Sequence, residues 1–183
     1  MEMDAKQERE QMEYLARMIN PAKWELQSFM TSRGQIAADA ITGCLRTQGN
    51  TLSFWESSKD KTDVEKVALA LASARQKIDK LQIILIPRTE FPPDNFDFSK
   101  TDGNTPFLEL RHKHMDMVNI DMTTLCQVAE KIAPKIRNNH EELLFQFTQK
   151  EVKRLIIQGV IDGFIEIDKL DTDIKKAIKN EID

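Results

Sequence analysis

The sequence has few of the features that would place it in a class at once. Its uninterrupted apolar runs are short, as at Ile83-Ile84-Leu85-Ile86, whereas a helix that spans a bilayer needs about 20 apolar residues. Six of the first ten residues are charged, and no apolar signal core follows them. We therefore expect no membrane partner and no signal peptide, and we predict a cytoplasmic location.

Excess positive charge and paired cysteines are also missing. The 26 Lys and Arg residues against 30 Asp and Glu residues give a net charge of −4 at pH 7. A protein that binds duplex DNA normally has a basic excess, so nucleic acid is not a favoured partner, although the fold can still assemble a local basic patch. Cys44 and Cys126 lie far apart and predict buried free thiols in a reducing compartment.

Familiar catalytic motifs are absent from the sequence, which contains neither a Gly-x-Ser-x-Gly elbow nor a Gly-x-x-x-x-Gly-Lys loop. His112, His114 and Asp116 would share one face of a strand, and imidazole with carboxylate is a metal-ligand set. A solvated polar segment is favoured over a metal site at these residues. We therefore predict no cofactor and no catalytic residues, which favours a protein that is not an enzyme.

Local patterns predict both helices and strands. Residues 62–80 begin with a capping box, Thr62 to Glu65, and continue with apolar residues at spacings of three and four, which predicts a helix. Residues 81–87 are apolar and β-branched, as in a strand covered on both faces. A hairpin is predicted over 44–55 around Gln48-Gly49-Asn50, and the alternation over 23–30 predicts another strand.

These elements predict an α+β fold, a small and mainly antiparallel sheet packed with helices and followed by a helix-rich C-terminal part. A second capping box, Thr148 to Glu151, opens one of the C-terminal helices. The C-terminal part either completes the core or forms a subdomain. The chain is divided into an N-terminal helix or arm (1–20), an α+β core with a long loop at 88–106 (21–120), and the helical C-terminal part (121–183).

The long loop over 88–106 contains three phenylalanines among acidic residues, beside a double proline. If exposed, they would form an acidic, aromatic surface that docks a basic partner. If packed, the loop would cross the sheet and cover its open face, and this second arrangement is slightly favoured. The candidate binding residues of the surface are Phe91, Phe96, Phe98, Asp94, Asp97 and, from the predicted hairpin, Trp55.

The functional prediction is a non-enzymatic intracellular protein-binding module. One concrete form is an inhibitor or immunity-type protein that neutralises a basic enzyme through the acidic aromatic surface. One alternative is a metal-dependent enzyme that acts on nucleic acid or phosphoesters through His112, His114 and Asp116. Another is a DNA-binding regulator that uses the helices of 148–183, although Asp171 and Asp173 crowd the helix end that would meet the bases. The sequence predicts no oligomeric state.

Overall fold

The structure is a computed structural model of the 183-residue chain, and it describes residues 13–32, 34–138 and 140–182. Within these residues six strands form one antiparallel sheet in the order β4-β5-β2-β1-β3-β6. The predicted α+β fold is therefore confirmed. The strands are β1 (Tyr14–Met18), β2 (Leu52–Ser57), β3 (Leu81–Pro87), β4 (Asp97–Lys100), β5 (His114–Val118) and β6 (Leu144–Phe147).

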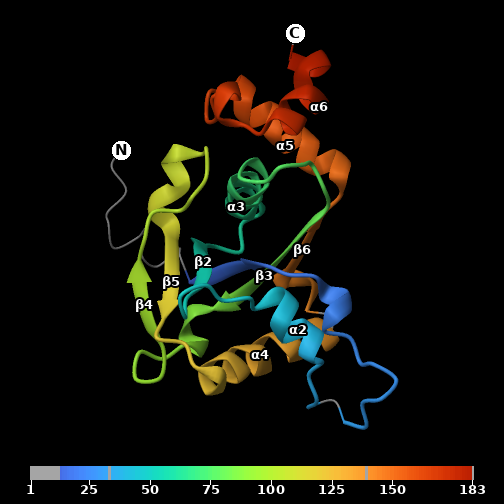
Figure 1. The fold of residues 1–183 in the computed structure, drawn as a ribbon, viewed down its shortest axis with the longest axis vertical. Helices are drawn as coiled ribbons and strands as arrows, with labels where there is room; N and C mark the ends of the chain where they lie inside the picture. The colour runs from blue at the N-terminus through green and yellow to red at the C-terminus, as the bar shows by residue number, and fades with distance from the viewer. Residues whose placement is uncertain (1–12, 33, 139, 183) are drawn as a thin grey trace.

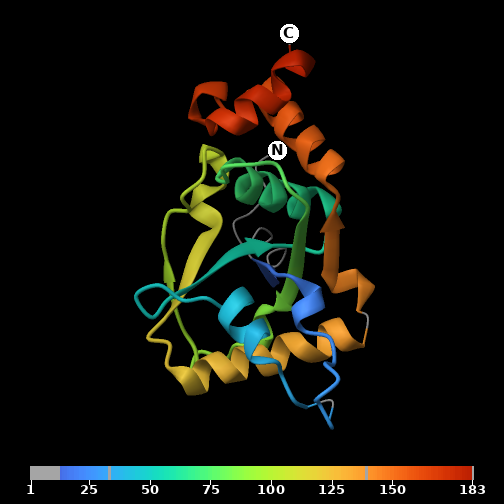
Figure 2. The ribbon, with the colours of Figure 1, turned by 45° about the vertical axis from the view of Figure 1, so that its right-hand side comes forward.

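Helices cover both faces of the sheet (Figure 1). On one face α3 (Lys61–Ser73) lies against the strands, and α5 (Gln149–Ile161) and α6 (Thr172–Ile182) pack beyond it. On the other face lie α2 (Ala38–Cys44) and α4 (Met122–Arg137). Figure 2 shows the same layers after a turn of 45°, with α5 and α6 at the end of the molecule beyond α3. In the described part of the chain, no helix is both long and apolar enough to cross a bilayer.

The two faces carry two apolar cores because successive residues of a strand point to opposite sides. On β3, Ile83 and Leu85 pack into the core beneath α3, whereas Ile84 and Ile86 pack into the core over α4. All four side chains are fully buried, and each contributes about 1.5–3 kcal/mol through its burial. The prediction of a strand covered on both faces over 81–87 is confirmed.

The predicted helix over 62–80 is present in its first part. It begins at Lys61, one residue early, because the Asp60 carboxylate accepts from the Thr62 backbone N–H at 2.7 Å and caps the helix in place of Thr62. It ends at Ser73, whose hydroxyl donates back to the Ala70 carbonyl. The apolar pattern continues because the segment that follows still packs on the core, as Ile78 does.

Tertiary pairing overrides several local predictions. Tyr14–Met18 was predicted as helix but is the strand β1, because it lies between β2 and β3 and pairs with both. The remainder of the predicted N-terminal helix, residues 1–12, lies outside the described residues. The strand predicted over 23–30 is a 3-10 turn, Pro21–Lys23, followed by a loop, because proline opens the turn and Trp24 enters the core.

The predicted hairpin is correct in its second strand, β2, and wrong in its first, since Cys44 ends the helix α2 and residues 45–47 are not in a strand. The long loop contains β4, the edge strand that pairs with β5. The predicted helical C-terminal part contributes a strand, β6, which pairs with β3, and a helix, α4, which packs on the core that contains Ile84 and Ile86. The second capping box is confirmed at the start of α5, where both reciprocal hydrogen bonds are present.

Candidate functional site

The three phenylalanines of the long loop lie inside the molecule. Phe91 and Phe96 are 4% and 5% exposed and meet edge to face with ring centroids 5.1 Å apart. Phe98 is partly buried and packs on Phe54 of β2 at 6.1 Å. The loop crosses the sheet, and its three rings pack into the core over α4. The packed arrangement is therefore the observed one. The predicted exposure of the rings is corrected on this point, since Phe91 and Phe96 are buried and Phe98 is partly buried.

Trp55 is likewise a core residue. Its side chain faces α3 and is 6% exposed, and the edge of its indole lies so close to Gly103 that a Cβ there would overlap it. Asp94 and Asp97 remain exposed, and Asp97 accepts from the Asn119 side chain at 3.2 Å. Of the predicted binding residues, these two carboxylates alone keep the exposure that the prediction required.

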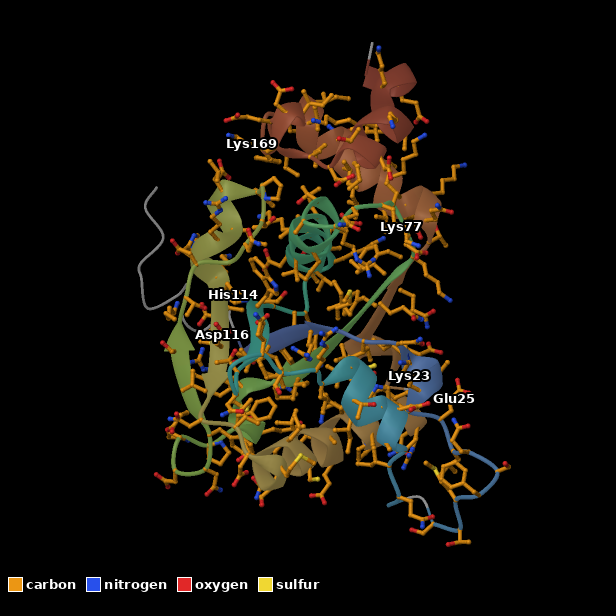
Figure 3. The ribbon with its side chains drawn as sticks, in the orientation of Figure 1. Lys23, Glu25, Lys77, His114, Asp116 and Lys169 are labelled. Carbon is orange, nitrogen blue, oxygen red and sulfur yellow. The ribbon has the colours of Figure 1, made fainter. Side chains whose placement is uncertain are left out.

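His114 and Asp116 lie on one face of β5, as the two-residue period predicts (Figure 3). The Thr101 hydroxyl donates to Asp116 Oδ2 at 2.9 Å and so accepts from His114 Nδ1 at 2.8 Å, because a hydroxyl has one proton to give. The Ser53 hydroxyl donates to the second carboxylate oxygen at 2.8 Å. Burial lowers the pKa of His114 below its ordinary value, and the nearby Asp116 carboxylate opposes that shift in part.

These contacts form a polar network around the Asp116 carboxylate. His112 belongs to the 3-10 turn Leu108–Lys113 that precedes β5, so its side chain does not continue the alternation of the strand. Across the residues that the structure describes, no three His, Cys, Asp or Glu side chains are grouped so that they could hold a metal ion. The predicted alignment of His112 with His114 and Asp116 is therefore corrected.

A different cluster of charged side chains surrounds a cavity of about 500 Å³ at one end of the central strands. The cavity lies where β1 ends and β2 and β3 begin, between α2 and the end of α3. We call it the cation pocket, because five of the six charged side chains in its lining are positive: Arg17, Lys23, Arg46, Arg75 and Lys80, with Asp79 as the sixth.

Arg17 is bound to the backbone at the inner wall of the pocket. Its Nε and Nη2 donate to the Cys44 carbonyl at 3.1 and 2.8 Å, and its Nη1 donates to the Ser53 carbonyl at 2.6 Å. Burial lowers the pKa of Arg17 to about 10, so the guanidinium is still protonated at neutral pH. Carbonyl oxygens orient this cation without neutralising it.

Arg75 and Lys23 approach the pocket from opposite helical layers. Arg75 follows the end of α3, and its Nη1 is buried with no hydrogen-bond partner in the described part of the chain. Lys23 lies against Gly43 of α2, where a Cβ would overlap its ammonium group, so glycine leaves the space that the lysine occupies (Figure 3). Among the described residues, none of the five cations lies within 4.0 Å of a carboxylate oxygen.

A second cavity, of about 760 Å³, lies between the end of α3, the loop before β5 and the connection from α5 to α6. We call it the α5–α6 cavity. Its lining contains three cations, Arg75, Arg111 and Lys169, and three carboxylates, Glu109, Glu166 and Asp171, so it carries no excess of positive charge. Arg75 lines both cavities, but the excess of positive charge belongs to the cation pocket.

Sequence reasoning missed the cation pocket because its five cations come from separate segments, and no motif joins them. The available signal was weak: Lys80 stands directly before the apolar run of 81–87, whereas the segment that contains Arg17 was predicted as helix. Comparisons of the chain with protein-family models, with curated protein sequences and with solved structures find no match.

Proposed function

We propose that the protein binds an anionic, phosphate-bearing ligand in the cation pocket. The observation that supports the proposal is the set of five cations around one cavity that have no carboxylate partner among the residues the structure describes. Two like charges about 8 Å apart repel by about 2 kcal/mol at the effective dielectric constant of a protein surface. A bound anion would offset this repulsion.

The types of side chain favour phosphate among anions. A guanidinium presents parallel N–H groups that match two oxygens of a phosphate, and charge-assisted hydrogen bonds of this kind are about twice as strong as neutral ones. The carbonyls of Cys44 and Ser53 fix the Arg17 guanidinium in advance, so less side-chain entropy is lost on binding.

The proposal is for binding without turnover. Apart from the cations, the titratable side chains of the pocket lining are Asp79 and Cys44. Asp79 is exposed, and the buried Cys44 sulfur accepts from the Asn20 backbone N–H at 3.3 Å. This retains the non-enzymatic binding class predicted from the sequence and gives it a different surface.

A thermal-shift and calorimetric titration with inorganic phosphate tests the proposal. Measurements belong at low ionic strength, because salt screens the exposed cations. We expect saturable binding and a rise in the melting temperature for the wild type, a marked loss of both in Arg75→Met, and no change in the matched control Lys77→Met. Lys77 is exposed and lies outside the pocket lining. Equal responses of the two variants, or no saturation, would refute the proposal.

Docking of a protein partner is a second candidate function, favoured by exposed apolar side chains near the connection from α5 to α6. Large exposed apolar groups gathered at one place are typical of protein contacts. Leu108 and Phe164 line the α5–α6 cavity. The exposed set at this end of the molecule is Leu108, Ile161, Phe164 and Ile167.

This surface replaces the long loop as the docking region, and the inhibitor or immunity-type role stays a prediction. A pull-down with Leu108→Asp tests it, with Met122→Asp as the control because Met122 is similarly exposed at the start of α4. We expect a partner to be lost by the first variant and kept by the second. Loss by both, or by neither, would exclude this surface.

A further inference from the structure

The charge of the cation pocket exceeds what one phosphate group can balance. Five cations and one carboxylate leave four positive charges unmatched, whereas a phosphate monoester carries about −1.5 to −2 at pH 7. A ligand with a single phosphate would therefore leave about half of the excess unbalanced. Two or three linked phosphate groups would match it.

The cations are also placed at different depths. The Arg17 guanidinium is bound to backbone carbonyls in the wall, and the Arg75 Nη1 is buried. Arg46 and Lys80 are exposed at the rim, and Lys23 is half-buried. The cavity of about 500 Å³ has room for more than one phosphate group. A second, linked phosphate would meet the rim.

Part of the remaining lining is apolar, beside the polar residues Asn20, Ser53 and Gln82. Leu71, which is half-buried, and Met18, which is 39% exposed, contribute apolar side chains to the same cavity, whose volume falls in the range of roughly 300–1,000 Å³ that is typical of sites for small organic ligands. Trp55 also lines the pocket, but its indole is 6% exposed, so little of its ring is open to a stacking base. Because the apolar wall offers no open aromatic face, we expect the pocket to accept an organic group and to discriminate little between bases.

We infer that the cation pocket selects an organic polyphosphate, of the class of nucleoside diphosphates and triphosphates, with the phosphates on the cations and the organic part on the apolar wall. This inference rests on the proposed function, since it names the ligand class of the same pocket. Arg17 and Arg75 hold the inner phosphate, Arg46 and Lys80 hold the outer one, and little discrimination between bases is expected.

Calorimetric titrations of the full-length wild type test the ligand class, with EDTA present so that no metal–nucleotide complex forms. The probes are inorganic phosphate, tripolyphosphate, ATP and GTP. We expect tripolyphosphate to bind about tenfold or more tightly than phosphate, because each added charge-assisted contact is strong. ATP and GTP should bind more tightly than tripolyphosphate and within about threefold of each other.

The double variant Arg46→Gln/Lys80→Gln tests the assignment of the rim. We expect it to lose about tenfold or more in affinity for tripolyphosphate and less than threefold for phosphate. Arg75→Met should weaken both ligands, and Lys77→Gln neither. Because the rim residues are exposed, the double variant is expected to fold, and circular dichroism checks this.

The outcomes separate the inference from the proposed function. If phosphate binds saturably and tripolyphosphate binds no more tightly than phosphate, the inference is overturned and the proposed function stays in place. If tripolyphosphate binds more tightly than phosphate but ATP and GTP bind no more tightly than tripolyphosphate, the assignment of an organic group to the apolar wall is overturned. Tighter binding of a short single-stranded oligonucleotide than of ATP would assign the pocket to a nucleic-acid backbone and also overturn the inference. No binding of any probe would refute both proposals.

Discussion

Replacement of Arg75 by methionine is expected to make the ligand-free protein more stable. The Nη1 of Arg75 is buried and has no hydrogen-bond partner among the described residues, and the arginine contributes to an excess of positive charge around the cation pocket. Methionine keeps an unbranched apolar stem and removes the polar head. The variant therefore removes an unfavourable group and preserves its packing.

The size of the effect follows from the cost of a buried donor without an acceptor, about 1–3 kcal/mol. Lost contacts of the rest of the guanidinium reduce the gain, so we expect about 1–2 kcal/mol in the free energy of unfolding. For a protein of this size, 1 kcal/mol raises the melting temperature by about 2–4 °C. Lys77→Met, an exposed neighbour, should change stability by less than about 0.5 kcal/mol.

Urea denaturation at low ionic strength measures this prediction. The midpoint for Arg75→Met should rise while the dependence of the free energy on urea stays that of the wild type. Addition of tripolyphosphate at 100 times its Kd should stabilise the wild type by about 2.7 kcal/mol and so reverse the order of the two proteins. If the free variant is less stable than the wild type, Arg75 has a structural role, and the functional reasoning about it fails.

Three further predictions concern residues outside the pocket's cations. Gly103→Ala should cost about 1–3 kcal/mol in urea denaturation because its Cβ would overlap the Trp55 indole; unchanged stability would show that the loop yields freely. Phe91→Ala should cost about 3–5 kcal/mol because the ring is buried, whereas a small cost with lost partner binding would restore the exposed-loop hypothesis. Because burial lowers the pKa of His114 from its ordinary 6.5, the folded state holds this proton less tightly than the unfolded chain, so stability falls as the pH drops below 6.5. His114→Asn should flatten the stability profile between about pH 7 and pH 5, and an unchanged slope would contradict the shift.

The parts of the fold that local chemistry controls could be predicted from the sequence. The capping box at Thr148 and the apolar run of 81–87 were interpreted correctly, because a cap forms among residues a few positions apart and a continuous apolar run is typical of a strand between two cores. The start of α3 was misplaced by one residue, because Asp60 and Thr62 are both good caps and only the packed structure selects between them.

The candidate site could not be predicted in the same way. The sequence around Phe91 and Phe96 is the same whether the loop is exposed or packed, so it does not predict their burial. The burial depends on β2, where the Phe54 ring lies 5.9 Å from the Phe91 ring, centroid to centroid. His114 and Asp116 share a face as predicted, but the hydroxyl of Thr101 joins them. Its position on the neighbouring segment follows from the pairing of β4 with β5.

By itself, the sequence determined the fold class, the central helix and buried strand, and an acidic chain without a familiar catalytic motif. These properties depend on composition and on residues close together along the chain. Only the tertiary structure decided that Tyr14–Met18 is a central strand, because its pairing partners β2 and β3 lie far along the chain. It also decided that cations of an acidic protein gather around one cavity, because strand and helix ends from separate segments meet there.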